Sequence, residues 1–304
     1  MLIYLDQNKW IELARMCHGK PDAQGKTDAE VTRRVLADFQ IVDGIHVITP
    51  LSAYHYMETC RQRNAATRYR LGIVMWGFSK GVSLASPKAI MRHELSTALA
   101  KQIPEIKPDP LFLLGRGSCH AFDQPPFRPE LQKYAALIER SLLTGYRPLG
   151  IPPAMFGEGR GRRLFQKQLS TLRHRASALP QKQRDDFLYA QLTADIVDVI
   201  CELFAKYSVR AEALGDLGRE RLRSVIDDMP TRRVDLHLMR QVLKNPEYRA
   251  KESDLEDWCG LGTAACYCDV VVCEKHMAAM LRRDGFLTRA RIETQLPNTF
   301  SKVA

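Results

Sequence analysis

Two short apolar runs lie near opposite ends of the 304-residue chain, and an acidic residue follows each of them. Asp6 follows the first run, Leu2–Leu5, and Glu274 follows the second, Val270–Cys273. A continuous apolar run of this length is typical of a parallel strand that is buried on both faces. Ligands bind outside the carboxyl ends of such strands, so both acids are placed where chemistry occurs. Asp6 could instead cap a helix that starts near Lys9.

Strand and helix patterns alternate around these runs. Residues 8–19 have helical spacing, and a second amphipathic helix is expected from Thr27 to Gly44, with Glu30 completing a capping box. A short strand is expected at 46–50, then a helix from Ser52 to Gly81, and near the other end a helix at 276–283 and a strand at 289–294. This alternation predicts an α/β fold with a central parallel sheet and right-handed crossovers.

The middle of the chain follows another pattern. From Pro87 to Met229 long helical stretches are separated by loops rich in proline and glycine, without a convincing strand. We therefore expect an inserted all-α region at 96–229, between the two parts of an α/β core at 1–95 and 230–304.

Composition narrows the class of protein. The net charge of +10 and the pI near 9.3 favour a polyanionic partner. The eight cysteines include no CxxC pair, which indicates reduced thiols in a cytoplasmic protein and argues against zinc, although Cys266 and Cys268 are separated by one residue. The start of the chain lacks a signal-peptide pattern, and the longest apolar stretch, around 71–78, is too short for a bilayer, so no membrane association is expected.

Acidic residues recur where the predicted sheet would gather them. Glu58 lies in the helix after the second strand, and Ser253 and Glu256 form a capping box that would place Asp254 and Asp257 one turn apart at the start of a helix. Two carboxylates about 5 Å apart repel by roughly 3 kcal/mol, so such a cluster needs a cation. Oxygen ligands without histidine favour Mg²⁺ or Mn²⁺. Asp269 is expected at the opposite edge of the sheet, as a structural turn residue.

Three segments resemble the PIN-like nuclease family: "IYLDQNKWIELA", "PLSAYHYMETC" and "DWCGLGTAACYCDVVVCEK". The resemblance covers about the first 95 and the last 75 residues. It implies a three-layer α/β/α core in which Asp6, Glu58 and Asp257 coordinate metal and Asn8 orients Asp6. Where the family often has a threonine, one further residue and an aspartate, this chain has Cys273, Glu274 and Lys275. Glu274 is the nearest substitute for the fourth acid, and Asp254 and Asp269 are the alternatives.

The resemblance implies metal-dependent hydrolysis of RNA phosphodiester bonds, with DNA not excluded. The biological role could be that of a toxin, a defence effector or an RNA-processing factor. An antitoxin-like protein or a second copy of the chain would be a fitting partner. Two basic stretches could hold the nucleic acid, although an ordinary solvated helix face explains the first equally well. Their residues are Arg160, Arg162, Arg163 and Lys167 in the first, and Arg232 and Arg233 in the second.

Two other readings fit parts of the pattern. A phosphatase that forms an aspartyl-phosphate also begins with a strand ending in Asp, but it usually has a second Asp two residues later, where this chain has Asn8. A catalytically degenerate PIN-like module that binds RNA or protein is the stronger alternative, because the sequence around Glu274 departs from the family pattern.

Overall fold

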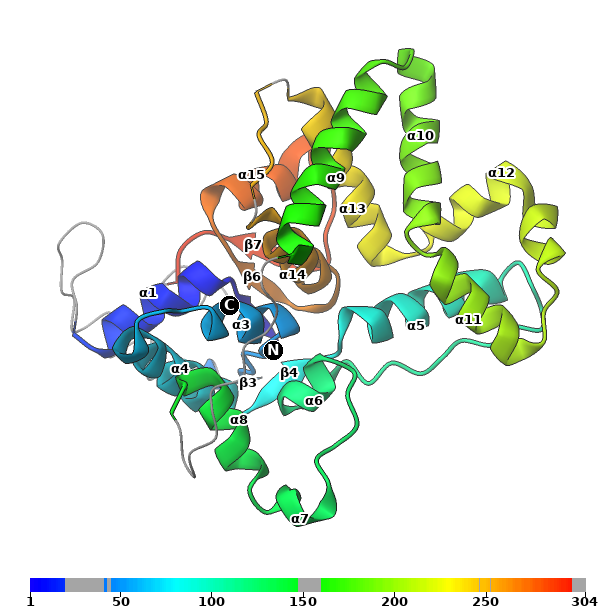
Figure 1. Cartoon of the computed structure of the whole chain (residues 1–304). Helices are drawn as coiled ribbons and strands as arrows, with labels where there is room; N and C mark the ends of the chain where they lie inside the picture. The colour runs from blue at the N-terminus through cyan, green and yellow to red at the C-terminus, as the bar shows by residue number, and fades with distance from the viewer. Residues whose placement is uncertain (20–40, 43–44, 147–159, 246, 252, 297–304) are drawn as a thin grey trace. The chain divides into compact units, whose positions relative to one another are not determined.

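The computed structural model describes the chain except for residues 20–40, 43–44, 147–159, 246, 252 and 297–304 (Figure 1). The described residues are mostly helical and include a three-stranded parallel sheet. The chain forms two compact units, which are described separately below. The first unit consists of residues 1–86, 113–158 and 259–304, and the second consists of residues 87–112 and 159–258.

The two ends of the chain pair directly in the sheet of the first unit. Its strands are β1 (Ile3–Leu5), β6 (Val270–Val272) and β7 (Arg291–Glu293), all parallel and in the order β1-β6-β7. In the register, Leu5 lies opposite Val272. β1 and β6 are fully buried, as their apolar sequences predict. The predicted parallel sheet assembled from both ends of the chain is therefore confirmed, whereas a PIN-like three-layer core is not established by these strands.

Shorter strand pairs complete the first unit. β2 (Ile41–Val42) pairs antiparallel with β3 (Ile45–His46), and β4 (Val82–Leu84) pairs antiparallel with β5 (Leu114–Arg116). A parallel bridge from Leu2 to Ile48 places the predicted second strand beside β1. Two expectations were wrong: β5 lies in the stretch expected to lack strands, and β2 occupies the end of the helix expected at 27–44, of which 27–40 lies outside the described residues.

The helices of the first unit differ from the expectation mainly after Ser52. One continuous helix was expected there, but the chain breaks at 61–64, where the Asn64 side chain accepts a hydrogen bond from the Thr67 amide (2.9 Å) and starts a new helix. The helical elements are α1 (Gln7–Cys17), α3 (Ala53–Cys60), α4 (Ala65–Ser79), α6 (Gly117–Ala121), α7 (Pro129–Gln132), α8 (Ala135–Thr144), α15 (Lys275–Arg282) and the 3₁₀ turn η2 (Arg283–Gly285).

Close helix packing explains why residues 113–158 belong to the sheet unit. A Cβ atom added at Gly72 of α4 would lie 2.6 Å from the backbone of Leu143 in α8, so the two helices approach too closely for any larger residue. Arg68 of α4 is buried and donates hydrogen bonds to the carbonyl oxygens of Leu142 (2.6 Å) and Leu143 (3.3 Å). The apolar core under this pair includes Trp10 and the buried strand residues.

The second unit is helical throughout its described residues. It contains α5 (Pro87–Ala100), α9 (Arg160–Ser177), α10 (Gln181–Ala194), α11 (Val197–Tyr207), α12 (Glu212–Asp227) and α13 (Pro230–Lys244). α14 (Asp254–Tyr267) begins in this unit and ends in the first one. A helical region was expected, but its limits differ: the unit also takes in residues 87–95 and 230–258, and it excludes 113–158.

None of the described helices has both the length and the apolar character that crossing a membrane requires.

Candidate active site at the carboxyl ends of the strands

Asp6 lies immediately after β1 and also caps α1. Its amide donates a hydrogen bond to the Val272 carbonyl oxygen (2.9 Å), which continues the pairing of β1 with β6. Its carboxylate accepts a hydrogen bond from the Gln7 amide (2.7 Å), at the position where helix α1 begins. The residue is 6% exposed. Both interpretations of Asp6 therefore hold together: it is a helix cap, and it lies at the carboxyl end of a buried strand.

Glu274 lies beside Asp6 because β1 and β6 pair in parallel register. It occupies the N-cap position of α15, and its side chain is exposed. The Asn8 side-chain amide donates a 2.7 Å hydrogen bond to a carboxylate oxygen of Glu274. The side chain of Asn8 therefore reaches the neighbouring strand end, and its expected role in orienting Asp6 stays a prediction.

Burial raises the pKa of Asp6 to about 6. The Gln7 amide opposes this shift, the negative charge of Glu274 adds to it, and the positive charge of Lys9 opposes it. A carboxyl group with a raised pKa is one whose ionised form is destabilised by its surroundings. A bound cation would relieve this cost.

A buried tyrosine connects Glu58 with this corner of the sheet. Burial raises the pKa of Tyr4 well above its usual value, and the negative charges of Asp6 and Glu58 add to the shift. The Tyr4 hydroxyl lies 3.0 Å from the Ser52 hydroxyl. Glu58 is in the last turn of α3 and is half-buried. Both predicted acids therefore act on the same phenol, which stays protonated.

His55 fastens the start of α3 to the end of β1. The Ser52 amide donates a hydrogen bond to its Nδ1 (3.0 Å), so Nε2 carries the proton and donates it to the Leu5 carbonyl oxygen (2.8 Å). The ring stacks on Tyr4 with 4.8 Å between centroids. Burial lowers the pKa of His55 to about 4, so the imidazole is neutral at pH 7.

Gln7 follows Asp6 in the chain, and its side chain is buried. Its amide nitrogen donates a hydrogen bond to the Thr59 hydroxyl (3.1 Å). Its carbonyl oxygen, Oε1, has no hydrogen-bond partner among the described residues, and a buried acceptor without a partner costs free energy. Asp6 and Glu274 offer oxygen donors of the kind that Mg²⁺ and Mn²⁺ prefer, so this corner fits the implied metal.

The two acids at the start of α14 belong to the second unit. The Asp254 carboxylate accepts hydrogen bonds from the Tyr248 hydroxyl (2.6 Å) and the Lys251 amide (2.8 Å), which gives it a structural role, and its metal-binding role stays a prediction. Asp257 is half-buried and lies one turn before Gly260. Its part in a shared metal site stays a prediction. Among the residues that the structure describes, no group of three His, Cys, Asp or Glu side chains is placed to hold a metal ion.

The part of α14 inside the first unit packs tightly on Tyr4. A Cβ atom added at Gly260 would lie 2.8 Å from the Tyr4 hydroxyl oxygen. Glycine is therefore needed at this position for the helix to approach β1.

Asp269 has the structural role that was predicted. Its carboxylate accepts a 2.7 Å hydrogen bond from the amide of Leu2, at the start of β1, and Arg289 contacts it at 3.4 Å. It lies at the amino end of β6, opposite to the edge that carries Glu274.

The basic residues divide into two groups. Arg162 pairs with the buried carboxylate of Glu256 (2.6 Å), and Arg232 pairs with Asp235 (3.1 Å). These two arginines are engaged within the protein, which corrects the expectation that they hold nucleic acid. The other predicted cations with described side chains are exposed, namely Arg163, Lys167 and Arg233. Arg160 starts α9, but its side chain lies outside the described part of the chain.

The sequence did not predict a role at this corner for three of its residues, Tyr4, Gln7 and His55. A signal existed for His55, because it lies three residues after the helix cap Ser52, where a polar side chain can reach back to the cap amide. The roles of Tyr4 and Gln7 depend on residues about 50 positions away and leave no local signal.

No protein-family model, curated protein or solved structure matches this chain. The resemblance to PIN-like nucleases therefore depends on the three sequence segments alone.

Proposed function

We propose that this protein is a divalent-metal-dependent ribonuclease whose ion binds at the carboxyl ends of β1 and β6. The observation that carries the proposal is the placement of Asp6 against Glu274, with the pKa of Asp6 raised to about 6. Burial raises the pKa of this carboxyl group by more than the amides of Gln7 and Glu274 and the positive charge of Lys9 lower it. The PIN-like character of the core is part of the same proposal.

The chain's own residues would bind and orient the ion. Asp6 and Glu274 supply carboxylate oxygens, and Asn8 holds Glu274 in place through its 2.7 Å hydrogen bond. Glu58 adds negative charge to the same corner. A bound Mg²⁺ or Mn²⁺ would supply positive charge for the phosphodiester and lower the pKa of a bound water.

RNA is the proposed substrate because the resemblance to PIN-like nucleases implies it, and the charge of the chain agrees with a nucleic acid. The net charge of +10 favours a polyanion, and Arg163 and Lys167 lie exposed one turn apart on α9. Asp257 keeps the metal-binding role that the resemblance implies, as a prediction that mutation tests separately.

A cleavage assay with end-labelled RNA and DNA tests the proposal. The wild type should cleave RNA with Mn²⁺ or Mg²⁺ and stop with EDTA, and Asp6→Asn and Glu274→Gln should each lose the activity. Glu130→Gln removes an exposed acid on α7 as the matched control and should cleave like the wild type. Identical traces for wild type, Asp6→Asn and the EDTA sample would refute the nuclease.

A degenerate nuclease that only binds RNA or a protein is the second candidate. The departure at Cys273, Glu274 and Lys275 favours it, because a glutamate that starts α15 replaces the usual fourth acid. RNA binding that persists in EDTA, without metal-dependent cleavage by the wild type, would support this candidate.

A further inference from the structure

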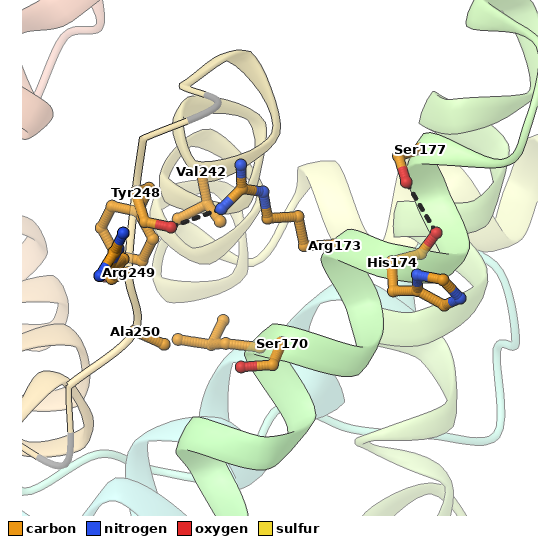
Figure 2. A pocket seen from close by; sticks show the side chains of 9 residues that line it. Ser170, Arg173, His174, Ser177, Val242, Tyr248, Arg249 and Ala250 are labelled. Carbon is orange, nitrogen blue, oxygen red and sulfur yellow. Dashed lines mark hydrogen bonds between the residues drawn. The ribbon is translucent and has the colours of Figure 1, made fainter.

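A hollow of about 450 Å³ lies within the second unit (Figure 2). One wall is a face of α9, another is the end of α13, and the third is the loop that precedes α14. The residues lining it are Leu169, Ser170, Arg173, His174, Ser177, Val242, Tyr248, Arg249 and Ala250. A hollow of this size falls within the range of pockets that bind small organic ligands.

The described residues that line this hollow include three basic side chains, those of Arg173 and His174 from α9 and that of Arg249 from the loop. None of these described lining residues is Asp or Glu. Arg249 and His174 are exposed, so both can meet a ligand. The Arg173 guanidinium donates a hydrogen bond to the Tyr248 carbonyl oxygen, which fixes the loop against α9 (Figure 2). The hollow is thus suited to an anion.

Part of the remaining lining is apolar and fixed in place. Leu169 and Val242 are buried, and Tyr248 is held by the hydrogen bond from its hydroxyl to Asp254 (2.6 Å). Gln166 of α9 also donates a hydrogen bond to the Ala250 carbonyl oxygen (2.8 Å). Two contacts from α9 therefore hold the loop in place, which makes the hollow a formed site.

We propose that this hollow binds a phosphate group attached to a nucleoside. Arg249, His174 and Arg173 would face the phosphate, because arginine forks match its oxygens, and the apolar residues and Tyr248 would face the organic part. The phosphate can belong to a free nucleotide or to a nucleic-acid strand, and the two sources are distinguished below. The inference does not rest on the proposed nuclease, since every lining residue belongs to the second unit and none is an acid.

Calorimetric titration of the full chain with four probes tests the proposal. The probes are inorganic phosphate, 5′-AMP, adenosine as the ligand without phosphate, and a six-nucleotide single-stranded RNA. We expect 5′-AMP or the hexamer to bind and adenosine to bind at least tenfold more weakly. Arg249→Gln should weaken binding by about tenfold, because it removes a charge-assisted hydrogen bond, and His174→Gln should weaken it as well, because it removes the ring nitrogens that line the hollow. Arg175→Gln removes an exposed arginine of the same helix that does not line the hollow, and should leave binding unchanged.

The outcomes separate the sources of the phosphate and can overturn the proposal. Binding of the hexamer alone supports the site with a strand as its ligand, and binding of 5′-AMP as well supports a free nucleotide. Equal binding of adenosine and 5′-AMP, no binding of any phosphate probe, or equal weakening by Arg175→Gln would overturn it. Thermal unfolding checks that each variant is folded, and His174→Gln, which leaves the loop intact, keeps the test decisive if Arg249→Gln unfolds. Asp6→Asn should bind the probes like the wild type, which separates this result from the fate of the nuclease proposal.

Discussion

Asp6 stabilises the fold as a cap and destabilises it as a buried charge. Its pKa of about 6 in the folded protein lies above the ordinary aspartate value of 3.8. The folded state therefore binds more protons than the unfolded state between these pH values. The stability contributed by the protonated form is therefore present below pH 4 and is lost as the pH rises through 6. The difference between these two pKa values changes the free energy of unfolding by roughly 3 kcal/mol at most.

We expect Asp6→Asn to raise the free energy of unfolding at pH 7.5, by about 1–3 kcal/mol, because asparagine caps helices as well as aspartate and carries no charge. The gain should shrink towards pH 4.5, as the wild-type carboxyl group becomes protonated. Urea unfolding of both proteins across this range measures it. A variant less stable than the wild type by the same amount at every pH would contradict the raised pKa.

The titration of His55 also changes the stability of the protein with pH, so the stability of Asp6→Asn has to be compared with that of the wild type at each pH. The His55 pKa of about 4 in the folded protein lies below the ordinary histidine value of 6.5. The contribution of His55 to stability is therefore lost as the pH falls from 6.5 to 4. The effects of His55 and Asp6 oppose each other between pH 4 and 6. The difference between Asp6→Asn and the wild type cancels the part due to His55.

Asn8 is expected to act through Glu274 alone. Asn8→Ala removes the 2.7 Å hydrogen bond and should weaken Mn²⁺ binding by about 10–100-fold, as is typical when a residue that orients a metal ligand is lost. Adding Asn8→Ala to Glu274→Gln should weaken binding little further. Calorimetric Mn²⁺ titration of the two single variants and the double variant measures this. Additive losses would show that Asn8 acts elsewhere.

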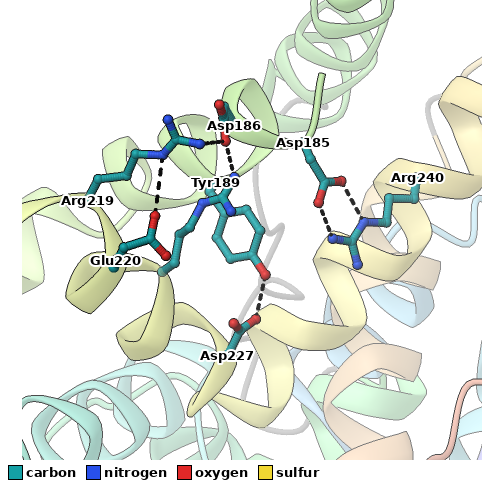
Figure 3. A network of polar contacts seen from close by, with 8 residues as sticks. Asp185, Asp186, Tyr189, Arg219, Glu220, Asp227 and Arg240 are labelled. Atoms are coloured by element: carbon teal, nitrogen blue, oxygen red, sulfur yellow. Dashed lines mark hydrogen bonds and ion pairs between the residues drawn. The ribbon is translucent and has the colours of Figure 1, made fainter. Parts of the chain in front are cut away.

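At the scale of elements, polar contacts fasten the helices of the second unit (Figure 3). Arg240 of α13 makes two hydrogen bonds to Asp185 of α10, at 2.7 and 3.0 Å, which lower the pKa of that carboxyl group. Tyr189 of α10 donates a 2.6 Å hydrogen bond to Asp227 of α12. These contacts are partly exposed, so each contributes modestly, and apolar packing supplies most of the stability.

The pair of Arg162 and Glu256 joins α9 to the start of α14 and is more deeply buried. The Glu256 side chain is 1% exposed, so Arg162→Gln would leave a buried carboxylate without its ion pair. We expect a loss of about 2–4 kcal/mol in the free energy of unfolding, measured by urea denaturation. Arg163→Gln, on the exposed side of the same helix, should change it by less than about 0.5 kcal/mol.

The double variant Arg162→Gln/Glu256→Gln should recover much of that loss, because it removes the stranded charge. An equal loss in the Arg162 and Arg163 variants would indicate that the pair contributes nothing measurable.

At the scale of the whole molecule, the excess of ten positive charges should govern nucleic-acid binding. Contact with about six phosphates of single-stranded RNA would give a slope near −4 in a plot of log K against log salt. Fluorescence anisotropy of labelled RNA between 50 and 200 mM KCl measures the slope. Arg163→Glu/Lys167→Glu should make it shallower, and Lys182→Glu/Arg221→Glu, which changes two exposed cations of α10 and α12, serves as the control of equal charge change. A slope near zero for the wild type would exclude a phosphate-dominated interface.

The sequence by itself determined the local features of this protein. Apolar runs predicted the buried strands β1 and β6, and Asp6 and Ser52 predicted helix starts, since these signals act within a few residues. It could not predict β4 and β5, because Ser83 and Gly115 interrupt their apolar residues, so neither strand forms a continuous apolar run as β1 and β6 do. The polar partners were decided by tertiary structure: parallel pairing brings Asn8 to Glu274 across 266 residues, and burial of Glu256 withdraws Arg162 from solvent. Desolvation and close packing act between segments that the sequence separates, so they depend on positions that only the folded chain defines.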